Sequence, residues 1–230
     1  MRISFSGLTL TEGKVKYNDS RLSKIAEKIP SQKSTPLFFE FIPDNYGASD
    51  AIIILKDRIL DLLILDMERL ESRLERTDQG PQINLFKKCL SALEKESALC
   101  DLELEVSELE PLRQIDLLSL KPVVVEDNPD IEPDAAIRKV LDKAGCIIFY
   151  TANKKETRAW VVKKGADIVQ AAARIHTDLA RGFIRAEVVN FDDFADVHNI
   201  NEAKSKGLVK TVGKDYKVGE ADIIEIKFNV

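Results

Sequence analysis

Apolar residues in the middle of the chain recur at the three-and-four spacing of an amphipathic helix, and this segment separates two stretches of alternating strand and helix patterns. The spacing is carried by Leu62, Leu63, Met67, Leu70 and Leu74, and again by Leu85, Phe86, Cys89, Leu90 and Leu93. Between the two runs, "TDQGPQI" breaks the pattern with Gly80 and Pro81. We therefore predict an αα-hairpin over residues 57–100.

The stretches on either side of the helical segment have the pattern of an α/β unit. Before it, "RISFSGL", "SRLSKIAEKI" and "PLFFEFI" predict strand, helix and strand. After it, "LKPVVVED", "PDAAIRKVLDKAG" and "CIIFYTA" predict the same order. The simplest organisation joins residues 1–56 and 120–146 in one α/β unit, with residues 57–119 inserted as a helical hairpin.

Residues 147–230 have a different pattern, in which short strands surround one helix. "TRAWVV", "FIRAEVV", "LVKTVG" and "DIIEIKFNV" predict the strands, and "DIVQAAARIHTDLARG" predicts the helix. Several short strands wrapped on one helix are typical of a small α+β domain of the β-grasp kind. The predicted fold class is therefore α/β plus α+β.

Composition and cysteine spacing exclude several classes of protein. The 230 residues are 44% hydrophobic and 32% charged, as in ordinary globular proteins. No apolar run approaches the roughly 18 to 20 residues of a membrane span, and the apolar stretch at the start is short for a signal peptide, so we expect a cytoplasmic protein without membrane contact. Cys89, Cys100 and Cys146 lack CxxC spacing, which predicts buried reduced thiols with neither zinc nor a disulfide.

Charge is distributed unevenly along the chain. Residues 57–119 carry 8 Lys and Arg against 15 Asp and Glu, whereas residues 147–230 carry 14 against 12. The resulting net charges are −7 and +2. A mildly basic C-terminal segment is compatible with RNA contact, although it falls short of a strongly basic footprint.

The segment "GLTLTEGKV" approaches a phosphate-binding loop. Gly7, Gly13 and Lys14 match in kind, but five residues separate the glycines where GxxxxGK[ST] has four. Val15 occupies the position of the hydroxyl that would bind magnesium. Asp44 begins "DNYG", which is good turn chemistry without any ligand. We therefore predict no phosphate-loop chemistry.

The stretch "IHTDLARGFIRAEVV" contains His176 and Asp178, which raise the alternative of acid–base or metal chemistry. No second cluster of His or Cys accompanies them, and no nucleophile stands in a recognisable motif. Thr177 and Asp178 can bond nearby backbone amides, which favours a capping or packing role at a helix end. Arg181 and Arg185 are candidates for phosphate contact, with solvated surface arginines as the alternative.

The segments "KETRAW", "IHTD", "RGFIRAEVV", "GKDYKV" and "FNV", in this order, resemble the TGS domain of the YchF/Obg-like ATPase family. The resemblance covers about 80 residues. It implies a β-grasp TGS domain over residues 147–230 of a regulatory or RNA- and ribosome-associated kind, which is not itself catalytic. The residues matching the motifs, with a structural role implied, are His176, Thr177, Asp178, Gly182, Lys214, Asp215 and Tyr216.

Upstream, the resemblance continues in a shortened form. "NDSRLSKIAEKIPSQKSTPLFFEFI" is similar to the family's segment before the DxxG strand, and "LKPVVVEDN" is similar to the strand leading to its base-recognition NxxE, although Glu132 lies one position too far on. The P-loop with its helix and the switch region have no counterpart. The resemblance therefore implies a reduced G-domain-like unit with a vestigial nucleotide site made of Gly7, Gly13, Lys14, Asp44 and Asn128.

The function predicted from these observations is a non-catalytic adaptor without cofactor or metal. Its TGS domain would bind the ribosome, structured RNA or a translation-associated partner, with the hairpin as a second arm. The RNA or partner-binding candidates, expected near one exposed face, are Arg158, Lys163, Lys164, Arg181 and Arg185. Two alternatives stay open: a residual ATP- or GTP-binding protein, and a protein-interaction module that pairs through the hairpin.

Overall fold

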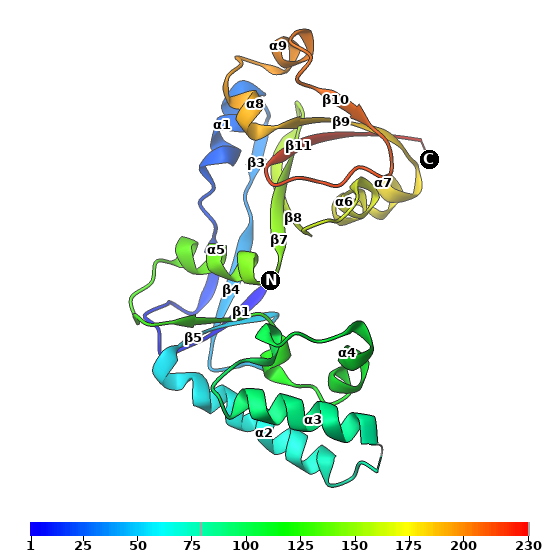
Figure 1. The fold of residues 1–230 in the computed structure, drawn as a ribbon. Coiled ribbons are helices and arrows are strands. Elements are labelled where there is room, and N and C mark those ends of the chain that lie inside the picture. Colours follow the sequence, from blue (N-terminus) through cyan, green and yellow to red (C-terminus); the bar gives the residue numbers. More distant parts are fainter. Residues whose placement is uncertain (79, 230) are drawn as a thin grey trace. The chain divides into compact units, whose positions relative to one another are not determined.

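The computed structural model describes residues 1–78 and 80–229, which form two compact units (Figure 1). Unit 1 contains Met1–Val15 and Phe39–Ala144, and unit 2 contains Lys16–Phe38 and the chain from Gly145 onward. The fold is mixed α/β, with one sheet in each unit. The chain therefore passes from unit 1 into unit 2 at residue 16, returns to unit 1 at residue 39, and enters unit 2 again at residue 145.

The sheet of unit 1 is largely parallel and buried. Its strands are β1 (Arg2–Ser6), β2 (Gly13–Lys16), β4 (Phe38–Pro43), β5 (Ala51–Leu55) and β6 (Val123–Glu126), in the order β2-β4-β1-β5-β6. β1 is parallel to β4 and β5, and β5 is parallel to β6. Ile3 and Ile52 to Ile54 are fully buried, as expected for parallel strands covered on both faces.

Helices follow β5 and fill most of the rest of unit 1. They are η1 (Lys56–Arg58), α2 (Ile59–Leu74), α3 (Gly80–Leu93), η2 (Leu99–Asp101), α4 (Val106–Arg113), η3 (Leu118–Leu120) and α5 (Pro133–Lys143). The buried residues of α2 and α3 share one apolar cluster with Ile52 and Ile54 of the sheet. Gln79, which falls in the predicted break between the two helices, lies outside the described residues.

Helix α4 has no counterpart in the elements that the sequence predicts, because its apolar pattern is weak and Pro111 lies inside it. A capping box starts it, with the Glu108 side chain accepting a hydrogen bond from the backbone N–H of Glu105 at 2.8 Å. Cys89 and Cys146 are buried and Cys100 is half-buried. Burial raises the pKa of the Cys89 thiol to about 11.

Unit 2 is a six-stranded sheet with helices on both faces. Its strands are β3 (Lys33–Thr35), β7 (Cys146–Ala152), β8 (Glu156–Lys163), β9 (Phe183–Asn190), β10 (Lys210–Val212) and β11 (Asp222–Phe228), in the order β10-β9-β11-β7-β8-β3. β7 and β11 are parallel neighbours, β7–β8 and β9–β11 are antiparallel, and β3 is parallel to β8. The helices are α1 (Ser20–Lys28), α6 (Ile168–Ile175), α7 (Thr177–Arg181), α8 (Phe191–Ala195) and α9 (Ile200–Ser205).

Helices α6 and α1 cover opposite faces of this sheet. Phe149 of β7 is buried in a cluster with Ile168 and Ala172 of α6. The next residue, Tyr150, donates a hydrogen bond to Asp19 at the start of α1. Because successive side chains of a strand point to opposite faces, the two helices enclose the strands between them.

Residues 16–38 were expected in the first α/β unit, whereas α1 and β3 pack within unit 2. Lys33, Ser34 and Thr35 of β3 pair with Glu156, Thr157 and Arg158 of β8. The apolar spacing predicts α1 itself correctly, but it carries no information about the sheet that the helix covers. That choice depends on contacts with residues more than a hundred positions away.

The structure predicts that Asp66 is required for the stability of unit 1. Its buried carboxylate accepts hydrogen bonds from the backbone N–H groups of Leu118 and Ser119, both at 2.7 Å. Asp66→Ala would leave both donors unpaired and lower the free energy of unfolding by about 3 kcal/mol. Asp61→Ala removes an exposed carboxylate from the same helix and should cost less than about 0.5 kcal/mol. Urea unfolding followed by circular dichroism measures both, and equal midpoints would contradict the assignment.

Candidate functional site

Three of the predicted nucleotide-site residues lie at one edge of the unit 1 sheet. Gly7 follows β1, Asp44 follows β4 and Asn128 lies two residues after β6. These strands are parallel, so their carboxyl ends meet at the same edge, where ligands of open α/β sheets commonly bind. Gly13 and Lys14 instead begin β2, the strand beyond β4.

The loop after β1 is fastened to the loop after β6. The Thr9 backbone N–H donates to the Pro129 carbonyl at 2.9 Å, and the Thr9 hydroxyl is 3.0 Å from Asp130 Oδ1. Asn128 Oδ1 accepts from the backbone N–H of Asp130 at 3.0 Å. The Thr9 amide and hydroxyl therefore join the two loops, whereas the Asn128 side-chain oxygen is engaged within the loop after β6.

Gly7 is held in a left-handed conformation, with φ of +72°, against β5. A Cβ at this position would lie 2.8 Å from the Leu55 Cβ, so only glycine fits without displacement. The neighbouring Leu8 and Leu10 are buried. The conformation and packing of Gly7 therefore determine the course of the backbone in this loop.

The "DNYG" segment forms a turn that is tied to the sheet. The Asp44 backbone N–H donates to the Phe5 carbonyl at 3.0 Å, and Asn45 Oδ1 accepts from the Ala48 N–H at 3.2 Å. Lys121 donates to the carbonyls of Tyr46 and Gly47 at 2.7 and 2.9 Å. Burial lowers the pKa of this Lys121 ammonium. These contacts describe a structural turn.

In unit 2, His176 lies between α6 and α7. Its Nδ1 accepts a hydrogen bond from the Asp178 backbone N–H at 3.2 Å, and Asp178 Oδ2 lies 3.4 Å from the same nitrogen. The His176 side chain is 65% exposed. Thr177 is the first residue of α7 and Gly182 follows its last. The local role of the histidine is thus a helix cap.

The "GKDYKV" segment connects α6 to β11. The Ile168 N–H donates to the Tyr216 carbonyl at 2.9 Å, and the Tyr216 hydroxyl donates to Asp222 Oδ2 at 2.8 Å. Burial and this hydrogen bond raise the pKa of Tyr216. Lys214 and Asp215 are exposed at the tip of the segment.

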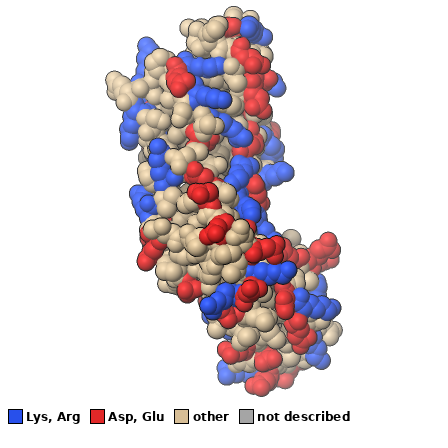
Figure 2. All heavy atoms as spheres, turned by 90° about the vertical axis from the view of Figure 1, so that its left-hand side faces the viewer, with Lys and Arg blue, Asp and Glu red and all other residues tan. Residues whose placement is uncertain are grey.

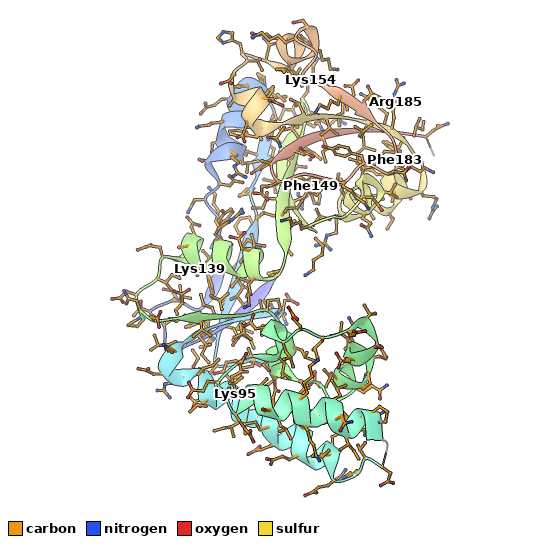
Figure 3. All side chains as sticks on the ribbon, viewed as in Figure 1. Lys95, Lys139, Phe149, Lys154, Phe183 and Arg185 are labelled. Carbon is orange, nitrogen blue, oxygen red and sulfur yellow. The ribbon has the colours of Figure 1, made fainter. Side chains whose placement is uncertain are left out.

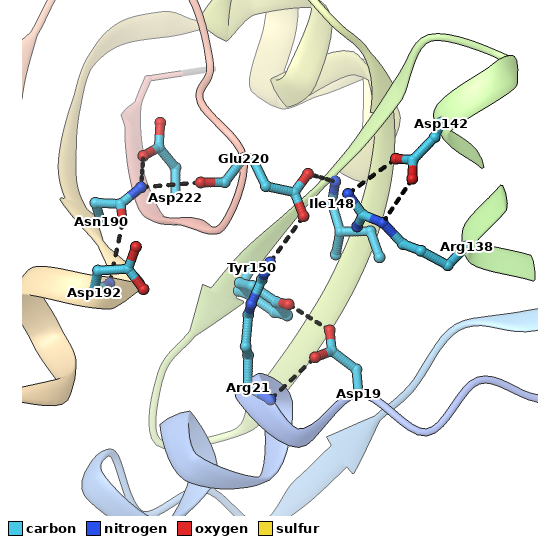
Figure 4. A network of polar contacts seen from close by, with 10 residues as sticks. All are labelled: Asp19, Arg21, Arg138, Asp142, Ile148, Tyr150, Asn190, Asp192, Glu220 and Asp222. Carbon is cyan, nitrogen blue, oxygen red and sulfur yellow. Dashed lines mark hydrogen bonds and ion pairs between the residues drawn. The ribbon is translucent and has the colours of Figure 1, made fainter. Parts of the chain in front are cut away.

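A polar network attaches α1 to the sheet of unit 2 (Figure 4), and no sequence motif indicates it. Asp19 accepts from the Tyr150 hydroxyl and caps α1 through the Arg21 N–H. Arg21 contacts Glu220 at 2.8 Å, and the other Glu220 oxygen accepts from the Ile148 N–H at 3.0 Å. Burial raises the pKa of the Tyr150 hydroxyl, and Asp19 adds to this effect. The partners are so far apart in sequence that no spacing rule could have paired them.

The structure does not bring the five predicted basic residues to one face. Arg158 lies over the Trp160 ring at 4.1 Å, on the α6 side of β8. Lys163, five positions further along the same strand, points to the opposite side, and Lys164 follows the strand end. Arg181 ends α7, while Arg185 lies on β9, which two intervening strands separate from β8. Figure 3 shows Phe149 and Phe183 on the α6 side of the sheet and Arg185 on the other.

Arg185 shares its side of the sheet with a groove of about 640 Å³. The groove is lined by residues of α1, the β7–β8 turn, β9, β11 and α9, including Pro30, Lys154, Val189, Asn201, Lys204 and Ile223. The sequence alone does not reveal this groove, because its lining comes from five separate segments. Among residues 1–78 and 80–229, no group of three or more His, Cys, Asp or Glu side chains is placed to hold a metal ion. No described helix is long and apolar enough to cross a membrane.

The two units differ strongly in charge. Unit 2 carries 19 Lys and Arg against 14 Asp and Glu, a net +5, whereas unit 1 carries 15 against 25, a net −10. Residues 16–38 add five cations and two anions to the C-terminal segment, which explains the rise from the +2 of residues 147–230. Figure 2 shows that the positive and negative side chains are interspersed on the face it draws.

Comparison with known proteins finds the same mixed α/β architecture in a YchF protein. Residues 146–229 match a family described as YchF-GTPase_C, a protein of unknown function (DUF933). A solved Schizosaccharomyces pombe YchF GTPase structure covers 95% of this chain, with 88% of that chain covered, a TM-score of 0.79 and 19% identity, which shows a common fold.

Sequence comparison with curated proteins also finds YchF and Obg-like ATPases. The ribosome-binding ATPase YchF of Buchnera aphidicola is 26% identical over 253 residues, covering 83% of this chain and 70% of that protein. Obg-like ATPase 1 of Rattus norvegicus is 47% identical over 81 residues, covering 35% and 20%. The chain spans 61–64% of several further bacterial YchF proteins. This chain is therefore similar to YchF proteins over much of its length.

One prediction from the sequence is wrong. We expected that this chain is not an enzyme, because its sequence contains no counterpart of the phosphate-binding loop. The relatives are named as ATPases and a GTPase, so the likeness points to a family of ATPases. The absence of one loop motif was insufficient for a conclusion about the class of protein.

Gly182 provides a test of the junction between α7 and β9. A Cβ at this position would lie 2.1 Å from the Asn229 carbonyl oxygen, whose own residue donates a backbone hydrogen bond to Gly182 at 2.9 Å. Gly182→Ala should therefore displace the chain after β11 and destabilise unit 2 by about 1 to 3 kcal/mol. Gly213→Ala, where nothing lies within 4 Å of the added carbon, is the matched control. Fluorescence of Trp160, the single tryptophan, reports unfolding of unit 2; equal midpoints for the two variants would refute the steric account.

Proposed function

We propose that this chain acts in translation by binding the ribosome, and that unit 2 makes the contact with ribosomal RNA or with a protein bound there. The observation that carries the proposal is the +5 charge of unit 2 beside the −10 of unit 1. Relatives named as ribosome-binding support the same role. A cationic unit attracts RNA phosphates, whereas the acidic unit repels them.

In this proposal, unit 2 contains a TGS-like β-grasp domain extended by α1 and β3. Support comes from the parallel pair β7 and β11 at the centre of the sheet, each with an antiparallel partner, and from α6 packed across one face. The seven motif residues named above, from His176 to Tyr216, are proposed to have a structural role in this domain. Arg158, Lys163, Lys164, Arg181 and Arg185 stay candidate contacts, distributed over more than one face.

Unit 1 is proposed to be a reduced G-domain-like unit with α2 and α3 as an inserted hairpin. Only residues 7–12 separate β1 from β2, and this loop is too short for a crossover helix. The helices α2 and α3 lie between β5 and β6, which are parallel neighbours in the sheet. The proposed location of the whole protein is the cytoplasm, where ribosomes work.

A second candidate function is nucleotide binding at the carboxyl edge of the unit 1 sheet. The observation in its favour is the convergence of Gly7, Asp44 and Asn128 on that edge. Calorimetry with ATP and GTP in the presence of magnesium tests it. Heat of binding that is lost in Asn128→Ala supports this candidate, and absence of heat with both nucleotides removes it.

The hairpin offers a second contact surface for a basic protein. Leu60, Ile64 and Leu65 of α2 are 45%, 48% and 38% exposed, which leaves an apolar stripe without cover. The acidic residues beside it on the same helix are Asp61, Glu68 and Glu71. In this proposal the contact would act together with unit 2 at the ribosome.

Cosedimentation with ribosomes through a sucrose cushion tests the main proposal. We expect association at low salt and a loss of about tenfold or more in affinity as salt rises several-fold, because counterions released from RNA oppose binding at high salt. Arg185→Glu should weaken binding several-fold, with the acidic-unit variant Arg113→Glu as the matched charge control. The proposal fails if ribosomes do not bring the chain down at any salt concentration.

A further inference from the structure

The groove of unit 2 has an apolar floor. Val189 of β9 and Ile223 of β11 are directly opposite each other in the antiparallel pair, and both are at least 95% buried. Ile29 and Pro30 line it beside α1, and Ile200 and Val209 line it beside α9. A volume of about 640 Å³ lies in the range of small-molecule sites. Val189 and Ile223 thus close the bottom of the groove, and the partly exposed Ile29, Ile200 and Val209 provide apolar surface for a flat group that enters from the solvent.

Ion pairs cancel the negative charges in the groove. Lys204 lies 2.7 Å from Glu187, and Lys227 pairs with Glu225. The hydrogen bond from Lys204 lowers the pKa of Glu187, and the same bond raises the pKa of Lys204. Both members of this pair therefore stay ionised at neutral pH, and neither glutamate presents an uncompensated charge to a ligand.

Two further lysines give the groove a positive charge. The Lys28 ammonium donates to the carbonyls of Phe194, Ala195 and Val197, which are neutral and do not cancel its charge. Lys154 is exposed at the turn between β7 and β8, and the described chain places no carboxylate at ion-pair distance from it. The resulting electrostatic field favours an anionic ligand.

The asparagines of the groove present donors. Asn153 Oδ1 accepts from the N–H groups of Lys155 and Glu156, and Asn199 Oδ1 accepts from those of Asn201 and Glu202. Because these oxygens are occupied, the side-chain NH₂ groups are what Asn153 and Asn199 can offer to a ligand. The ligand should therefore carry acceptors.

We propose that this groove binds one unstacked nucleotide of single-stranded RNA, which deepens the ribosome-binding function proposed above and rests on it. A nucleotide has an apolar base face for Ile29, Ile200 and Val209, carbonyl and ring acceptors for the asparagines, and a phosphate for Lys154. A neutral peptide fits less well, because it has no phosphate for Lys28 and Lys154. In duplex RNA the base faces are stacked and cannot reach the floor.

The test uses the full chain and a fluorescein-labelled single-stranded RNA of mixed sequence, with affinity read by fluorescence anisotropy. Lys154→Glu should weaken binding by about tenfold, because it reverses the charge beside the proposed phosphate position. Lys155→Glu makes the same charge change at the adjacent exposed lysine, which does not line the groove, and should weaken binding less than about threefold. Equal effects of the two variants would overturn the proposal.

Two further measurements test whether an unstacked base lies in the groove. RNA carrying 4-thiouridine should crosslink on irradiation to peptides containing residues 199–201 or 223–225, and crosslinks confined to other segments would overturn the groove. A duplex of the same sequence should bind at least tenfold more weakly than the single strand; equal affinity would overturn it as well. Trp160 fluorescence verifies that each variant is folded.

Ribosome cosedimentation of the same variants separates this proposal from the one on which it rests. If the wild-type chain and Lys154→Glu cosediment equally, the groove is rejected while ribosome binding stands. If the wild-type chain does not cosediment, the proposed function fails, whereas the RNA measurements still decide whether the groove takes a nucleotide.

Discussion

The attachment of residues 16–38 to the C-terminal sheet determines much of this structure. Asp19 holds Tyr150 and Arg21 holds Glu220, while β3 extends the sheet beside β8. These contacts bury one face of the sheet under α1. The same segment lines one side of the groove with Ile29 and Pro30, and its lysines and arginine raise the net charge of unit 2 to +5. An early segment of the chain thereby becomes part of the C-terminal unit's proposed binding surface.

Local elements were predictable where one strong periodicity governs them. The three-and-four spacing predicted α2 and α3, and the aromatic run from Pro36 to Ile42 predicted β4. The short strands β2 and β3 were missed, because three or four polar residues become a strand only through their partners. The unit to which α1 belongs was missed for the same reason: its network joins residues separated by up to 199 positions.

The candidate residues illustrate the same limit. An odd spacing such as that of Arg158 and Lys163 places two side chains on opposite faces once a strand is assumed, so this part could have been read from the sequence. The groove could not, since Val189 and Ile223 become neighbours only through the register of β9 and β11. His176 shows the reverse case, where a chemically suggestive residue has a local capping contact.

The opposite charges of the two units restrict how RNA can approach. A net −10 on unit 1 disfavours every encounter that presents this unit to phosphates, whereas the +5 of unit 2 favours the others. Salt screens the attraction and the repulsion together, so it reduces orientation selectivity as well as affinity. Apolar contact within the groove is not screened by salt, and a base held there would preserve the correct orientation after long-range forces are screened. Charge would then guide the encounter, and the groove would decide which unit stays bound.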